Sequence, residues 1–97
     1  MIKQASTVIE LTVFNHAGVM SHITGLFSRR GFNLEGILCG QIEDGTKSRM
    51  YLLVNKDETL DQIVKQVSKL HDVINVSVRE DYDHSIFLRL HEFIIEK

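Results

Sequence analysis

The chain has 97 residues, of which 43% are hydrophobic and 25% are charged, and its formal net charge is −2. This length suits one small globular domain, and the near-neutral charge provides no field that would attract nucleic acid or an anionic membrane. The single cysteine, Cys39, excludes an internal disulfide and indicates a reducing compartment. No apolar run is long enough to span a bilayer and no signal-peptide pattern is present, so we expect a cytoplasmic protein.

A strand is expected over residues 7–14, where β-branched and aromatic residues dominate. A helix to about Arg30 should follow it, because apolar residues recur there at helical spacing. Those residues are Val19, Met20, Ile23, Leu26 and Phe27. Gly31 is well placed to be the left-handed cap at the end of that helix.

The segment between these two elements, residues 15–20, carries the strongest indication of a binding site. Asn15 is typical of turns and helix caps, and Gly18 lets the backbone bend or approach another group closely. The first N–H groups of the helix need acceptors, and a carboxylate is one candidate because a helix start offers oriented donors. The alternative is that Asn15 only caps the helix and water accepts the remaining N–H groups.

The following elements complete one domain, which we place at residues 1–80. They are a strand from about 33 to 43, an Asp44-Gly45 turn, a strand over about 48–55, a helix over about 58–70 and a strand over about 73–79. The β-α-β-β-α-β order is typical of the ferredoxin-like fold, an antiparallel four-stranded sheet with both helices on one face. The two middle strands lack clean alternation, so both faces of the sheet should be at least partly covered.

Residues 81–97 form a tail after this domain. A polar break over residues 81–85 is followed by apolar residues whose spacing fits a helix or a short strand. They are Ile86, Phe87, Leu90, Phe93 and Ile94. Such a tail either folds back on the sheet or docks on another protein.

Signals for catalysis, metal binding or nucleic-acid binding are weak. Ser21 and Ser28 lie outside any nucleophile motif, and the five histidines have no metal-binding spacing. Cys39 is expected to be a small apolar residue that is buried or lies at an interface. The RNA-recognition domain shares this element order but stacks bases on aromatic residues, of which Phe14 and Tyr51 are the only ones on the corresponding strands. We therefore expect no catalytic residue, no metal site and no nucleic-acid partner.

The segment from Asn15 to Ile37 closely resembles the ACT domain of the small, regulatory subunit of acetohydroxyacid synthase, also called acetolactate synthase. The specific parts are the N-x-x-G-V-M opening, the G-L-F-x-R-R-G-F-N-x-E core and the later Ser48-Arg49-Met50. The likeness covers roughly residues 7–79 and is closest to the short form with a single ACT domain.

The resemblance implies a regulatory subunit without catalysis of its own. Such subunits bind and activate a large catalytic subunit, which holds thiamine diphosphate, FAD and magnesium, and they confer feedback inhibition by valine or a related branched-chain amino acid. ACT domains of this type pair side by side, which implies a homodimer. Two alternatives stay open, namely a free-standing ACT-type amino-acid sensor that acts on another protein and a small enzyme on the same scaffold.

The same resemblance implies an effector site where two copies meet. Carried over by position, it consists of a loop of Asn15, Gly18, Val19 and Met20 and, from the facing strand of the other copy, Asn33 and Ile37. Helix-start N–H groups would bind the carboxylate of valine, and the amide oxygens of the two asparagines would accept from its ammonium group. The apolar side chains would surround the branched chain.

Overall fold

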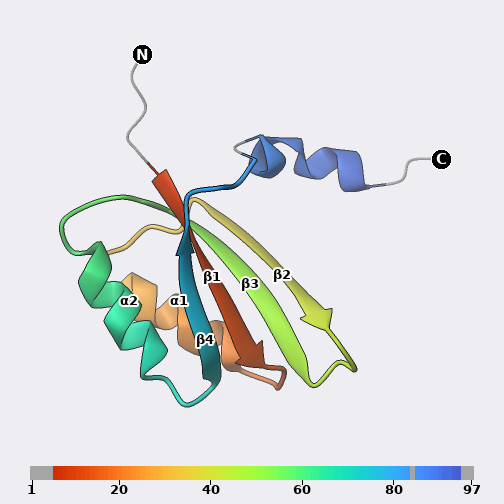
Figure 1. Ribbon diagram of the computed structural model, residues 1–97, viewed down its shortest axis with the longest axis horizontal. Coiled ribbons are helices and arrows are strands. Elements are labelled where there is room, and N and C mark those ends of the chain that lie inside the picture. The colour runs from red at the N-terminus through yellow and green to blue at the C-terminus, as the bar shows by residue number, and fades with distance from the viewer. Residues whose placement is uncertain (1–5, 84, 95–97) are drawn as a thin grey trace.

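The computed structural model describes residues 6–83 and 85–94 of the chain (Figure 1). Its elements are β1 (Ser6–Phe14), α1 (Val19–Arg29), β2 (Gly36–Ile42), β3 (Lys47–Asn55), α2 (Leu60–Ser68), β4 (Val73–Arg79) and the 3-10 helix η1 (Ile86–Phe93). The four strands form one antiparallel sheet in the order β2-β3-β1-β4, so β2 and β4 are its edges. This arrangement confirms the predicted ferredoxin-like fold.

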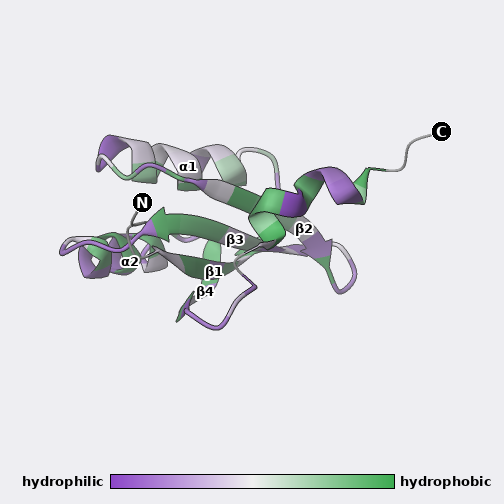
Figure 2. Ribbon diagram, turned by 90° about the horizontal axis from the view of Figure 1, so that it is seen from above, coloured by the Kyte–Doolittle hydropathy of each residue, from purple (hydrophilic) through white to green (hydrophobic). Residues whose placement is uncertain are grey.

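Both helices pack against the same face of the sheet and build the core with it. Alternate residues of β1 and β3 point to that face, because successive side chains of a strand lie on opposite sides. Those that are completely buried are Ile9, Leu11, Val13, Met50, Leu52 and Val54. Ile23 and Phe27 of α1 and Ile63 and Val67 of α2 pack against them, since each pair is spaced four residues apart on one side of its helix. Figure 2 shows that β1 and β3 are mainly hydrophobic along their length, whereas both helices are mixed.

The start of α1 differs from the prediction. The residue before the helix is Gly18, which has a φ of +88°, and no side chain caps the helix. Asn15 instead contacts the turn between β2 and β3, where its Nδ2 donates to the carbonyl oxygen of Gly45 at 2.8 Å and its backbone N–H donates to that of Thr46 at 2.9 Å. The alternative in which Asn15 only caps α1 is therefore wrong, and this residue instead connects the loop to the β2–β3 turn.

The end of α1 is as predicted, whereas β2 is shorter than predicted. Gly31 has a φ of +78°, and the N–H of Phe32 donates to the carbonyl oxygen of Phe27 at 2.9 Å, which confirms the left-handed cap. Residues 33–35 are not part of β2. Their side chains interact locally, since Asn33 donates to Glu35 at 2.7 Å, and such bonds compete with strand pairing. The helix α2 likewise begins and ends inside its predicted range.

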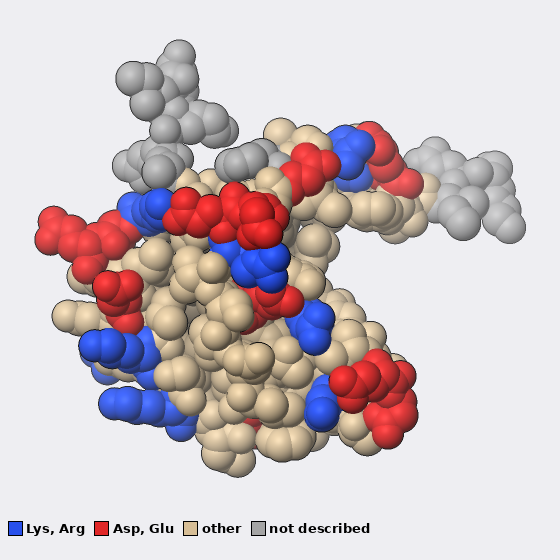
Figure 3. All heavy atoms as spheres, in the orientation of Figure 1, with Lys and Arg blue, Asp and Glu red and all other residues tan. Residues whose placement is uncertain are grey.

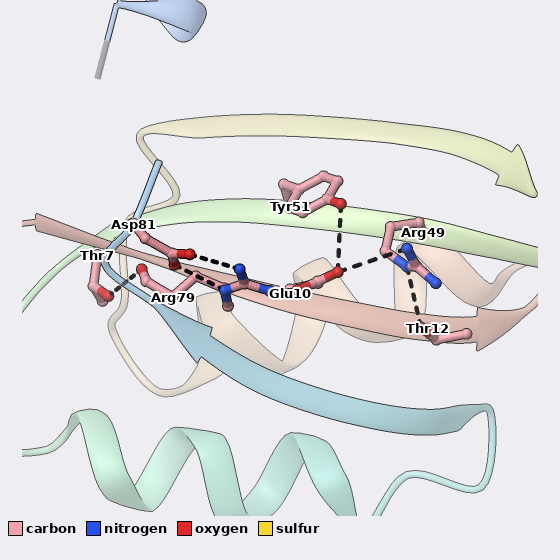
Figure 4. Close-up of polar contacts among 7 residues, drawn as sticks. All are labelled: Thr7, Glu10, Thr12, Arg49, Tyr51, Arg79 and Asp81. Atoms are coloured by element: carbon pink, nitrogen blue, oxygen red, sulfur yellow. Dashed lines mark hydrogen bonds and ion pairs between the residues drawn. The ribbon is translucent and has the colours of Figure 1, made fainter. Parts of the chain in front are cut away.

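The sheet face opposite the helices carries a chain of polar contacts centred on Glu10 (Figure 4). Its Oε1 pairs with Nη1 of Arg79 at 3.0 Å, and its Oε2 lies 3.7 Å from Nη1 of Arg49 and accepts from the hydroxyl of Tyr51 at 3.4 Å. Arg79 also donates two hydrogen bonds to Asp81, which holds the pKa of that carboxyl at about 2. This part of the face is polar rather than covered by apolar groups.

On this face the described part of the tail covers the start of β2, and the hydroxyl of Tyr82 lies 2.9 Å from that of Ser6 at the start of β1. A Cβ added to Gly36 would lie 2.5 Å from Cδ1 of Phe87, so the absence of a side chain at position 36 lets the aromatic ring lie against the strand. Val8, in the same cross-strand row, is buried. Beyond Phe87 the tail projects past the β2 edge (Figures 1 and 2), and Leu88 and Phe93 are 79% and 62% exposed. The tail thus folds back through the Phe87 ring and leaves other apolar side chains exposed.

Candidate effector site

The effector loop, residues 15–20, lies at the end of β1 and presents backbone donors. The N–H of Val19 donates to the carbonyl oxygen of His16 at 3.3 Å. Within the described part of the chain, the N–H groups of Met20 and Ser21 have no acceptor. Two donors at the positive end of a helix dipole are therefore available to an anion such as a carboxylate.

The apolar residues predicted for the site are not equally accessible. Val19 is 7% exposed and belongs to the core, so it can contribute to a ligand site mainly through its backbone. Met20 and Ile37 are 41% and 36% exposed. Only these last two side chains are in a position to contact the branched chain of an amino acid.

Asn33 and Ile37 lie at the far end of the sheet from the effector loop. Ile37 pairs with Leu52, which pairs with Ile9 near the start of β1, whereas the loop follows the last residue of that strand. Five residues of strand separate the two positions, which is a distance of roughly 17 Å. One chain alone therefore does not bring the two halves of the predicted site together.

A hollow of about 390 Å³ lies beside Asn33 at this far end. It is lined by Thr24, Ser28, Gly31, Phe32, Asn33 and Leu34. The hollow combines polar and apolar groups and lies between α1 and the segment that leads into β2.

Each of the two asparagines predicted to bind an ammonium group donates a hydrogen bond from its side-chain nitrogen. The Nδ2 of Asn15 donates to Gly45, and the Nδ2 of Asn33 donates to Oε2 of Glu35. Neither amide oxygen accepts a hydrogen bond within the described residues. Both oxygens are acceptors, which is what an ammonium group requires.

Asp72, in the turn between α2 and β4, contacts the effector loop and was not predicted. Its Oδ1 lies 2.7 Å from Nε2 of His16 and 3.3 Å from Nε2 of His71, and its Oδ2 lies 2.9 Å from Nδ1 of His22. Hydrogen bonds from His22 and His16 lower the pKa of Asp72, whose side chain is only 2% exposed. Contacts with the Ala17 carbonyl and with Asp72 raise the pKa of His16. Local sequence patterns could not reveal this cluster, because 56 positions separate His16 from Asp72.

Other kinds of site find little support in residues 6–83 and 85–94. No group of three or more His, Cys, Asp or Glu among them is arranged to hold a metal ion. No helix formed by them is long and apolar enough to cross a membrane. Cys39 is exposed in the single chain, so the expectation of a buried cysteine is wrong there, and its place at an interface stays a prediction. His84, which could have shared a helix face with His91, lies outside the described residues.

Comparison with known sequences identifies the family of the chain. Residues 9–75 match the AHAS (acetohydroxyacid synthase) small subunit-like ACT domain family. The chain is 49% identical over 88 residues to the small subunit of acetolactate synthase isozyme 1 from Escherichia coli K12, and 91% of each chain is covered. It is 40% identical over 79 residues to the acetolactate synthase small subunit of Mycobacterium bovis, with 80% of this chain and 46% of the longer relative covered.

Solved structures agree with the sequence comparison. The acetolactate synthase small subunit from Thermotoga maritima superposes with a TM-score of 0.71 and 33% identity, and 86% of this chain and 51% of that one are covered. The ACT domain from GTP pyrophosphokinase of Chlorobium tepidum superposes with a TM-score of 0.68 over 81% of this chain and 90% of its own, but its 21% identity shows the shared fold alone. The chain is therefore a member of the AHAS small subunit-like ACT domain family, together with small subunits of acetolactate synthase.

Proposed function

We propose that this chain is a non-catalytic regulatory subunit of acetolactate synthase. In this role it activates a large catalytic subunit and makes it sensitive to inhibition by valine or a related branched-chain amino acid. The 49% identity over 91% of both chains to the small subunit of isozyme 1 supports the assignment. Thiamine diphosphate, FAD and magnesium are assigned to the catalytic subunit.

The β2 edge is the proposed surface through which two copies pair. Edge strands of proteins that stay apart usually carry charged residues, bulges or proline. No residue of β2 is charged. The other edge, β4, carries Arg79 and an irregularity in its pairing with β1 between Thr12 and Val13. The residues of β4 therefore disfavour pairing at that edge, whereas those of β2 do not, which supports pairing through β2.

Pairing through β2 would unite the two halves of the effector site, and the separation of these halves within one chain supports this part of the proposal. Ile42, at the end of β2, is in register through Lys47 with Phe14, which precedes the effector loop. When two β2 strands run antiparallel about a two-fold axis, the start of each lies beside the end of the other. Asn33 and Ile37 of one copy then approach the effector loop of the second copy. The two halves of the site, which lie roughly 17 Å apart within one chain, would therefore meet across the interface between two chains.

Oxidative cross-linking tests this pairing. Cys39 is the central residue of β2 and would face the same residue of a second copy. Residues directly opposite in antiparallel strands have Cα atoms about 4.5–5.5 Å apart, within the range of a disulfide. Mild oxidation of the purified chain should give a disulfide-linked dimer on a non-reducing gel, and Cys39→Ser should give none. A chain that sediments as a monomer, or a dimer that resists oxidation, would contradict this register.

Substitution of Gly18 tests the effector site itself. Gly18→Asp places a carboxylate beside the free N–H groups, where it would repel the carboxylate of valine. Gly18→Asn is the matched control, because asparagine is similar in size, is uncharged and tolerates a positive φ. No atom lies within 4 Å of an added Cβ at this position, so both variants have room to fold.

The two variants should separate activation from inhibition when each is combined with the catalytic subunit. We expect Gly18→Asp to keep activation and to lose inhibition by valine, whereas Gly18→Asn keeps both. Equal valine sensitivity of the two variants would rule out the proposed site. A wild-type chain that fails to co-purify with the catalytic subunit would instead favour a free-standing sensor.

The tail is the proposed contact with the catalytic subunit. Its side chains at Leu88, Leu90, Phe93 and Ile94 are exposed, and they lie beyond the residues 9–75 that match the ACT family. Exposed apolar groups that project from a domain are typical of an interaction surface. Deletion of residues 85–97 should therefore weaken both binding and activation of the catalytic subunit. Unchanged binding and activation would refute a docking role.

A further inference from the structure

We propose that His16 and Asp72 form a proton-dependent clasp that positions the effector loop for its ligand. The clasp joins the loop after β1 to the turn between α2 and β4. Its effect on ligand affinity rests on the proposed function, because that part assumes that the loop binds the carboxylate of a branched-chain amino acid. Its effect on the loop itself does not.

The imidazole of His16 lies between two acceptors. Its Nδ1 is 2.9 Å from the carbonyl oxygen of Ala17, and its Nε2 is 2.7 Å from Oδ1 of Asp72. A carbonyl oxygen and an ionised carboxylate can only accept hydrogen bonds, so both ring nitrogens must donate. A neutral imidazole has a single N–H, and only the charged ring makes both bonds. The complete clasp therefore requires protonated His16.

The clasp holds the peptide bond that leads into the helix start. The Nδ1 of His16 donates to the carbonyl oxygen of Ala17, which precedes Gly18, the residue before α1. The N–H groups of Met20 and Ser21 belong to the first turn of the helix and have no acceptor among the described residues. The bond to Ala17 thus helps to orient the end of the loop from which those donors extend.

Asp72 provides a fixed anchor for the clasp. Its side chain is 2% exposed, and its carbonyl oxygen accepts the N–H of Phe14 at 2.9 Å. The residue therefore holds the end of β1 with its backbone and the effector loop with its carboxylate. Movement of the loop away from this turn would break the bonds of His16 and leave a buried carboxylate with fewer partners.

Two other titratable groups face the same carboxylate among the described residues. They are His22 on α1 and His71 in the α2–β4 turn, and both are largely exposed. The clasp is complete at pH values above the pKa of Asp72 and below that of His16. The pKa of Asp72 is lowered by its hydrogen bonds, and that of His16 is raised by its two acceptors. Affinity for the effector should accordingly fall as the pH rises through the pKa of His16, above its usual value of about 6.5.

Calorimetric titration with valine between pH 6.0 and pH 8.5 measures how the affinity for the amino acid depends on pH. The full chain is used as the wild type and as the variants His16→Gln, Asp72→Asn and His71→Gln. We expect wild-type affinity to fall about two- to fivefold over this range, as for a partly exposed charged pair. His16→Gln should be weaker at pH 6.0 and independent of pH. His71→Gln is the matched control, because it removes a histidine beside the same carboxylate without a link to the loop, and it should follow the wild type.

Measurements without ligand test the clasp independently of the proposed function. The imidazole pKa of His16 can be measured by NMR. The exchange rates of the Val19 and His22 amides, which donate to the carbonyl oxygens of His16 and Gly18 in the loop, can be compared between His16→Gln and His71→Gln at the same pH. A raised pKa in the wild type, lost in Asp72→Asn, and faster amide exchange in His16→Gln would support the clasp.

Each negative result has its own meaning. Because Asp72 is buried and Asp72→Asn could fail to fold, the half-exposed His16 provides the decisive variant. An ordinary pKa for His16 with unchanged amide exchange in His16→Gln would overturn the clasp. Wild-type affinity that does not change with pH would overturn its effect on the ligand. Absence of valine binding at every pH would overturn the proposed function while leaving the two ligand-free measurements decisive for the clasp.

Discussion

Gly36→Ala should displace the tail, because Phe87 occupies the space that a methyl group would need. The added Cβ would lie 2.5 Å from Cδ1, 2.8 Å from Cε1 and 3.1 Å from Cγ of that ring. Ordinary contacts between carbon atoms are about 3.5–4.0 Å. The ring must therefore move by about 1 Å or leave the strand.

The expected magnitude follows from two opposing terms. Full burial of a phenylalanine side chain contributes roughly 1.5–3 kcal/mol, and the partly buried Phe87 should contribute about 1 kcal/mol. Replacement of a strand glycine by alanine otherwise stabilises a protein by roughly 0.5–1 kcal/mol. Gly36→Ala should thus be close to neutral, because the lost packing offsets this gain.

Gly40→Ala is the matched control for this experiment. Gly40 lies in the same strand and on the same face, four residues away, and an added Cβ there meets no atom within 4 Å. Thermal unfolding should therefore place Gly36→Ala about 1 kcal/mol below Gly40→Ala, a difference of about 5 °C for a domain of this size. In a Phe87→Ala background the two glycine substitutions should become equivalent.

Hydrogen exchange provides the second readout of the same prediction. The N–H groups of Leu88 and Arg89 donate to the carbonyl oxygen of Ser85 at 3.0 and 3.1 Å in η1. Their exchange should accelerate in Gly36→Ala and stay unchanged in Gly40→Ala. Equal melting temperatures for the two variants, with unchanged exchange in the tail, would refute the inference that Phe87 holds the tail on the sheet.

Three further predictions concern the core, the open face and the β2 edge. Phe27→Ala should lower the free energy of unfolding by about 3–5 kcal/mol in a denaturant titration, because the ring is fully buried, whereas Phe93→Ala should have little effect on the isolated chain. Arg79→Gln should return the pKa of Asp81 from about 2 toward its usual 3.9 in an NMR titration. In the wild type, the stabilisation by this ion pair is lost as the pH falls through about 2, and the variant should show no such loss because it lacks the pair. Partial desolvation raises the pKa of the Cys39 thiol, although the residue is exposed in the single chain, so alkylation near pH 7 should be slower than for a model thiol. A β2 variant that prevents pairing should be alkylated faster than the wild type.

The fold could be predicted from the sequence because its determinants are local. Apolar residues recur at helical spacing in α1 and α2 and lie on one face of β1, and their periods alone distinguish helix from strand. Gly31 was assigned correctly as a helix cap, since its position after Arg29 and Arg30 is a short-range signal. Such signals determine the order of elements, and the order largely determines the sheet.

Contacts between distant positions could not be predicted in the same way. The space that Gly36 leaves for Phe87, and the contacts of the Asp72 carboxylate with His16 and His22, join positions about 50 residues apart. Asparagine is a typical helix-capping residue, but the side chain of Asn15 instead donates a hydrogen bond to Gly45 in the β2–β3 turn, which lies close to it in space. Val19 was predicted to line the effector site, but its side chain packs in the hydrophobic core and is therefore not accessible to a ligand.

The proposed division of the effector site between opposite ends of one sheet would have a genetic consequence. In the proposed dimer, each site takes its loop from one copy and its strand from the other. A pair made from one copy with Gly18→Asp in its loop and a second copy altered at Ile37 in β2 would gather both lesions in one site and leave the second site intact. Two alleles that are each insensitive to feedback should therefore restore part of the inhibition when they are expressed together.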